Sequence, residues 1–163
     1  MVVLASLAVV AGVFTVARRG LFRGDSRPAP QDYQGQLTGE IRGLDVNQNG
    51  IRDDVETWIA QQFPEGSPER KAYLQLAADY QSVLLTTNNA ERSIHSLRTL
   101  AVSIGCLRHV LRSDAAVQIA QFKAVVLDND IRVRAWLKAY DRLKDFGIEA
   151  GSTPSASNCR FSM

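Results

Sequence analysis

Residues 45–56 read Asp-Val-Asn-Gln-Asn-Gly-Ile-Arg-Asp-Asp-Val-Glu, and the rest of the chain is best understood outward from this stretch. Oxygen-bearing side chains stand at its first, third, fifth, ninth and twelfth positions: Asp45, Asn47, Asn49, Asp53 and Glu56. Gly50 holds the sixth position, where a sharp turn favours a residue that tolerates positive φ. This is the spacing of a twelve-residue calcium-binding loop that runs into a helix.

The ligand chemistry explains the spacing. Calcium takes six to eight oxygen ligands at about 2.3–2.6 Å, and a chain that wraps the ion offers alternate side chains inward. The seventh position binds through its backbone carbonyl, so Ile51 serves although its side chain is apolar. Asp53 binds directly or through a water, and Glu56 closes the shell with both oxygens. The predicted Ca²⁺ ligands are Asp45, Asn47, Asn49, Ile51, Asp53 and Glu56.

The charge of this ligand set predicts moderate affinity. Only three carboxylates and two neutral amides surround the ion, so we expect weaker binding than in an intracellular calcium buffer. Asp54, at the tenth position, is expected to point away from the ion, near the helix N-terminus, where a negative charge is favourable. The alternative interpretation is an Asn-, Asp- and Gly-rich turn before an acidic helix start. Such turns rarely fill six positions in register, so we prefer the calcium site.

Residues 45–56 resemble the EF-hand-like calcium loops of exported bacterial proteins and of thrombospondin type 3 repeats, which have the form D-x-[DN]-x-[DN]-G-[IV]-x-D-x-x-E. Arg52 departs from the EF-hand pattern, which keeps a β-branched apolar residue at the eighth position. Gly35, Gly39 and Gly43 disfavour a helix before the loop. We therefore expect a loop followed by one helix, without a partner hand, and the resemblance implies a structural ion.

The wider chain is similar to uncharacterised exported proteins of Gram-negative bacteria. These place such a loop before a small helical domain with two cysteines. This resemblance implies export and a disulfide, and it implies no activity.

The start of the chain favours export. Residues 2–17 carry no charge, and this run is short for a membrane span, which needs about 20 residues. It suits the apolar core of a signal peptide, with Thr15-Val16-Ala17 as a cleavage site. Arginines follow the run, and no Lys or Arg precedes it. One alternative is therefore an uncleaved membrane anchor over residues 1–17, with the C-terminal domain in the cytoplasm, and another is a start of the protein further upstream that supplies the basic region. We predict a periplasmic or secreted protein because the loop and the cysteines agree with export.

The remaining chain divides into two parts. Glycine and proline recur among polar residues in 18–40, which we interpret as a linker or loosely ordered arm. Residues 41–163 then form the calcium loop and one helical domain.

Apolar residues in this domain recur at helical spacing. The predicted helices cover about 55–63, 68–84, 90–112, 114–127 and 130–146. Ser67 and Asn129 are expected as N-caps, Ser113-Asp114 as the start of the fourth helix, and Gly147 as the end of the fifth. The fold class is all-α, a small bundle of four to five helices.

The periodicity also predicts which side chains face inward. The predicted inward residues of the last two helices include Val117, Val133, Trp136, Leu137, Tyr140 and Leu143. Trp58, Trp136 and the tyrosines are expected in the core or at its rim, and we do not expect them to form a ligand cage.

The two cysteines allow several readings. In an exported protein, Cys106 and Cys159 are expected to form one disulfide that holds the tail to the helical body. In a cytoplasmic protein both would be free thiols. A zinc site built on Cys106 and His109 would need His95 and Cys159 as well. A thiol nucleophile with a histidine base would lack an orienting acid.

The charge distribution and the absence of known motifs argue against two classes of function, nucleic-acid binding and catalysis. The net charge is +2, and the stretch from Glu91 to Lys144 holds ten basic and five acidic residues, spread over several helices. No nucleic-acid motif accompanies them, so we expect a solvated surface and no nucleic-acid partner. The sequence lacks G-x-S-x-G, H-E-x-x-H, P-loop and G-x-G-x-x-G motifs, so we do not expect an enzyme.

We therefore predict an exported helical protein with one structural calcium ion, acting as a binding or scaffold module for a protein partner. The alternative is an envelope protein tethered to the membrane through residues 2–17, whose basic helices contact a partner or an anionic surface.

Overall fold

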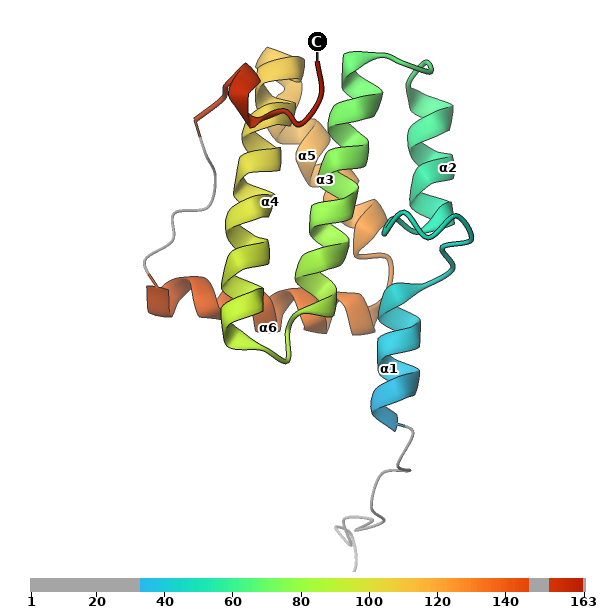
Figure 1. Ribbon diagram of the computed structural model, residues 1–163, viewed down its shortest axis with the longest axis vertical. Helices are drawn as coiled ribbons and strands as arrows, with labels where there is room; N and C mark the ends of the chain where they lie inside the picture. Colours follow the sequence, from blue (N-terminus) through green and yellow to red (C-terminus); the bar gives the residue numbers. More distant parts are fainter. Residues whose placement is uncertain (1–32, 147–152, 163) are drawn as a thin grey trace, which may run out of the picture. The chain divides into compact units, whose positions relative to one another are not determined.

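The computed structural model describes residues 33–146 and 153–162, and these residues form an all-α fold without strands (Figure 1). The α-helices of this region are α1 (Tyr33–Arg42), α2 (Asp53–Gln62), α3 (Pro68–Leu85), α4 (Ala90–Leu111), α5 (Ala115–Val126) and α6 (Asp130–Phe146). Short 3₁₀ helices span Arg112–Asp114 and Ala156–Asn158. The predicted fold class is confirmed. Residues 1–32, which include the predicted signal peptide or anchor, and Gly147 lie outside the described residues.

The antiparallel pair α3 and α4 forms the centre of the fold, with α6 across one end of it (Figure 1). Ser67 caps α3 by accepting a hydrogen bond from the Arg70 backbone N–H, and Asn129 accepts the corresponding bond from Arg132 N–H before α6. Both predicted caps are confirmed. The expected start of the fourth helix at Ser113-Asp114 is instead a 3₁₀ helix that continues directly into α5.

Helix α1 corrects the prediction of a loose arm over residues 18–40 for the part from Tyr33 onward. The glycines in this segment do not prevent the helix. Gly43 ends it with φ +67°, and its N–H donates to the carbonyl of Gly39. This is a left-handed C-terminal cap, which glycine adopts without strain. The loop at residues 45–52 thus lies between two helices, α1 and α2.

The buried face of α6 also differs from the prediction. Leu137 is 53% exposed and Tyr140 41% exposed, and Val133 is likewise exposed. The helix buries Ala135 and Ala139 instead. The same 3.6-residue period fits both faces, which differ by one residue, or about 100° around the helix.

The fourth predicted helix shows a related error. Val117 of α5 is 64% exposed, whereas Phe122, which was not predicted to face inward, is fully buried. The buried faces of α5 and α6 depend on one large residue, Phe122, and on two small ones, Ala135 and Ala139. The spacing of apolar residues alone does not identify these faces.

An aromatic cluster fills the space between α2, α3 and α5. Tyr73 lies at its centre, stacked on Phe63 at 4.6 Å between ring centroids and edge-on to Phe122 at 5.0 Å. Trp58 packs against both Tyr73 and Phe122. Aromatic pairs at such distances add about 0.5–1.5 kcal/mol each beyond the area they bury. Tyr73 and Tyr80 lie in the core and Trp58 and Trp136 pack against it, as predicted, whereas Tyr140 is exposed.

Two buried phenols make the fold sensitive to alkaline pH. Burial raises the pKa of Tyr73 and of Tyr80 to about 12. The unfolded chain releases these protons near pH 10, so the folded state holds more protons between pH 10 and 12. The stability that these two phenols contribute is therefore present below pH 10 and is lost as the pH rises toward 12, with a slope on the order of 1 kcal/mol per pH unit for each tyrosine. Urea unfolding at several pH values measures this slope. Tyr80→Phe should halve this slope.

Candidate metal centre

The backbone of residues 45–52 curls between the end of α1 and the start of α2. Its base is closed by a hydrogen bond from Asp53 N–H to Leu44 C=O at 2.9 Å. Gln48 and Gly50 adopt positive φ values of +57° and +83°, which bend the chain back on itself. The sharp turn predicted at the sixth position is present at Gly50.

Side-chain oxygens of the first half of the loop point toward its own backbone. Asp45 accepts from the N–H groups of Asn49 and Gly50 at 3.1 and 2.9 Å. Asn47 Oδ1 accepts from Asn49 N–H, and Asn49 Oδ1 accepts from Ile51 N–H at 2.8 Å. Each bond ties a side-chain oxygen of the loop to a backbone N–H of the same loop.

The Glu56 carboxylate faces the same interior from the first turn of α2. Its Oε2 accepts from the Asn47 side-chain amide at 3.0 Å, and its Oε1 accepts from the Asn49 amide at 2.6 Å. The side chains at the third, fifth and twelfth loop positions therefore meet. A bound cation would need amide oxygens in place of these N–H donors, and each amide supplies such an oxygen with two lone pairs.

The side chains of the predicted ligands Asp53 and Ile51 take no part in the hydrogen bonds that join Glu56 to Asn47 and Asn49. The Asp53 carboxylate accepts from Val46 N–H at 3.1 Å, so it braces the loop and does not join Glu56. The Ile51 side chain is buried in the core, which fixes the exit of the loop. Across residues 33–146 and 153–162, no three His, Cys, Asp or Glu side chains converge closely enough to hold a metal alone. The residues fit a calcium ion only with the amides as ligands and with the carboxylates drawn closer on binding.

Arg52 fixes the exit of the loop, a role that the ligand spacing does not predict. Its side chain is only 2% exposed and donates to Asp54 through Nε and Nη2, at 2.9 and 2.5 Å. It also donates to the carbonyl of Val126 and, at 3.1 Å, to Asp128. These hydrogen bonds from Arg52 hold the pKa of the Asp54 carboxyl below its usual value. Asp54 thus pairs with Arg52 and takes no part in the loop interior.

Arg132 fixes the start of the loop in the same region. It donates to the carbonyls of Glu40 and Ile41 at the end of α1 and forms an ion pair with Asp128. Gln81 donates to the Ile41 carbonyl as well, at 3.2 Å. Both ends of the loop are therefore joined to the one carboxylate of Asp128. An arginine in place of an apolar residue at the eighth loop position is the sequence feature that could have revealed this arrangement.

Asp128→Asn tests the role of this carboxylate. The substitution leaves two buried guanidinium groups without the charge that both contact, so it should lower the free energy of unfolding by about 1–3 kcal/mol. Urea unfolding measures the loss. Asp130→Asn removes an exposed carboxylate two residues away and should change stability by less than about 0.5 kcal/mol. Equal effects of the two substitutions would contradict a special role for Asp128.

The disulfide is present as predicted. Cys106 of α4 and Cys159 of the tail are bonded, with a Cα–Cα distance of 4.9 Å, and the described region has no free cysteine. The bond removes both thiols from the alternative zinc site and from the alternative nucleophile, since each requires a thiolate.

Comparison with known proteins gives no relative from which a site could be transferred. No protein-family model, curated protein or solved structure matches the chain. Within the described residues, none of the helices combines the length and apolar character that a bilayer span needs.

Proposed function

We propose that this protein is an exported helical module whose loop at residues 45–56 binds one structural calcium ion. The observation that carries the proposal is the convergence of the Glu56 carboxylate on the side chains of Asn47 and Asn49. These three residues come from opposite ends of the loop. Their meeting is what the twelve-residue ligand pattern requires and what an ordinary polar turn does not.

The position of the loop gives the ion a structural task. Glu56 lies on α2, the helix that carries Trp58 into the aromatic cluster and buries Ile59 completely. When bound, the ion would tie Asp45, Asn47 and Asn49 to the first turn of this helix and offset the carboxylate charge there. The protein then serves as a stable scaffold whose exposed surface meets a partner.

Export is supported by the disulfide. Structural disulfides persist in oxidising compartments such as the periplasm and the cell exterior and are rare in the cytosol. The Cys106–Cys159 bond is compatible with such a location. Free calcium is also abundant outside cells, so a site of moderate affinity would be filled there.

Calorimetric titration of the full chain with calcium tests the proposal. We expect one ion per chain, with a dissociation constant of about 10⁻⁴ M. Glu56→Gln keeps the acceptor oxygen for the amides but removes the charge and should weaken binding at least tenfold. Glu69→Gln is the matched control, since it removes a carboxylate from the first turn of α3. Absence of calcium binding at millimolar concentrations would reject the proposal.

A further inference from the structure

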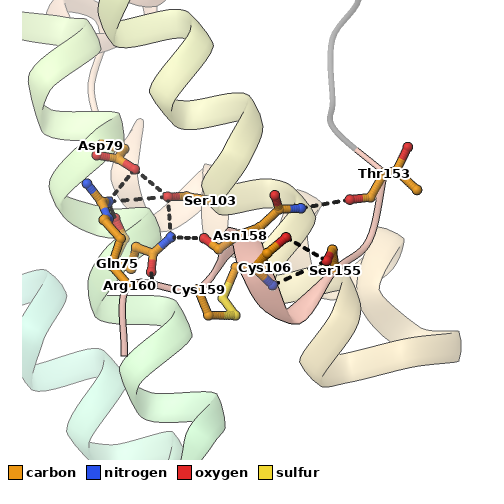
Figure 2. The surroundings of a disulfide bond; sticks show 10 residues. Gln75, Asp79, Ser103, Cys106, Thr153, Ser155, Asn158, Cys159 and Arg160 are labelled. Atoms are coloured by element: carbon orange, nitrogen blue, oxygen red, sulfur yellow. Dashed lines mark hydrogen bonds and ion pairs between the residues drawn. A yellow bond between two sulfur atoms is a disulfide. The ribbon is translucent and has the colours of Figure 1, made fainter. Parts of the chain in front are cut away.

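The C-terminal residues 158–160 lie in a polar site between α3 and α4 (Figure 2). The side chains that form this site, Gln75 and Asp79 of α3 and Ser103 of α4, are all buried. Buried polar groups are costly unless they are paired, and here the tail provides part of the pairing. The tail is therefore bound by the helices as a ligand would be.

The side chain of Gln75 binds backbone groups of the tail. Its Oε1 accepts from Arg160 N–H at 2.8 Å, and its Nε2 donates to the carbonyl of Asn158 at 2.9 Å (Figure 2). Cys159, between the two, is extended, with φ −87° and ψ 129°. One side-chain amide thus pairs with both sides of a short extended segment, and these two bonds do not depend on the side chains of that segment.

Asp79 recognises a guanidinium. Arg160 Nη2 donates to Asp79 Oδ2 at 2.6 Å and to Ser103 Oγ at 3.3 Å. Ser103 itself donates to the same carboxylate oxygen. The Asp79 side chain is only 8% exposed, whereas that of Arg160 is 54% exposed. Asp79 and Ser103 thus belong to the buried part of the helices, and the arginine reaches them from solvent.

The next residue of the tail adds an apolar contact. Phe161 is half-buried against the core, and Lys71 Nζ lies 5.9 Å from the centre of its ring. The bound segment thus presents an arginine followed by an aromatic residue, on an extended backbone.

We propose that Gln75, Asp79 and Ser103 form a binding site for an extended peptide segment that carries an arginine, and that residues 158–160 are its resident ligand. The Cys106–Cys159 bond keeps the resident segment in place. A dithiol reductant opens the bond by giving up two electrons and two protons, which leaves both cysteines as thiols and the reductant as its own disulfide. The tethered tail then competes only through its effective concentration, on the order of millimolar, and a peptide of another protein can replace it.

The test uses the full chain and a fluorescent peptide with the sequence of residues 153–162, in which serine replaces Cys159. Anisotropy reports binding. The oxidised protein should bind no peptide, and the protein treated with dithiothreitol should bind it. In a Cys106→Ser/Cys159→Ser background, Arg160→Ala weakens the resident tail and should raise the peptide affinity about tenfold. Adding Asp79→Asn should then lower it at least tenfold, whereas adding Glu65→Gln, at an exposed turn, should not.

The peptide itself provides a test that leaves the protein unchanged. Alanine at the position of Arg160 in the peptide should reduce its affinity at least tenfold, and near-ultraviolet circular dichroism confirms that each protein variant keeps its packing. Two results would overturn the proposal. One is equal binding of the arginine and alanine peptides, and the other is peptide binding that does not increase when the disulfide is opened or absent.

Discussion

Loss of the Cys106–Cys159 bond should lower the free energy of unfolding by about 4 kcal/mol. The two cysteines are 53 residues apart in sequence, and the bond restricts the unfolded chain by closing a loop of that length. The loss corresponds to a decrease in melting temperature on the order of 10 °C for a domain of this size. Urea unfolding of the oxidised protein and of Cys106→Ala/Cys159→Ala measures the difference.

The control for this experiment is the folded structure of the variant, which the polar site beside the bond should preserve. Gln75 binds the backbone of Asn158 and Arg160 without using either sulfur, so the variant should keep its helical circular dichroism spectrum before unfolding. A stability difference below about 1 kcal/mol would show that the unfolded chain is already restricted in this region.

Calcium should produce the second large effect. If free calcium exceeds its dissociation constant a hundredfold, binding to the folded state alone adds about 2.7 kcal/mol and raises the melting temperature by several degrees. Magnesium should do less, because it prefers a smaller octahedral site and releases water reluctantly. Calorimetric melts in calcium, in magnesium and in chelator measure these differences.

Two variants separate ion binding from the packing of α2. Glu56→Gln should remove most of the calcium-induced increase. Asp54→Ala should lower the melting temperature in chelator, because Arg52 loses a bidentate partner, and yet should keep the increase. Identical melting of the wild type with calcium and with chelator would contradict the assignment of the loop.

The sequence predicted the features that local chemistry determines. Caps at Ser67 and Asn129 act within one helical turn, and each was located from residue type alone. The pairing of Cys106 with Cys159 needed only the cysteine count and the expected compartment. The hydrogen bonds that join Glu56 to Asn47 and Asn49 lie within the twelve residues that the ligand spacing singled out, and calcium binding there stays a prediction.

Features determined by distant parts of the chain were not predicted. Carbonyl groups at the end of α1 are held by Arg132 and Gln81, which are 40 or more residues away, and no local pattern reports such contacts. The buried face of α6 depends on how closely Ala135 and Ala139 allow it to approach its neighbours. Arg52 is buried because its guanidinium donates to acceptors on a distant segment, the Val126 carbonyl and Asp128. The charged residues next to it in sequence would otherwise indicate an exposed position.

The attachment of both loop ends to Asp128 has a mechanical consequence. A force applied to the chain ahead of Tyr33 would pass along α1 to Glu40 and Ile41, and from there through Arg132 into α6 and through Gln81 into α3. The load would thus leave the chain before residue 45. Tension on the N-terminal side would strain the helical body and spare the geometry of the loop, so the arrangement of residues 45–56 would not depend on whether the chain is pulled.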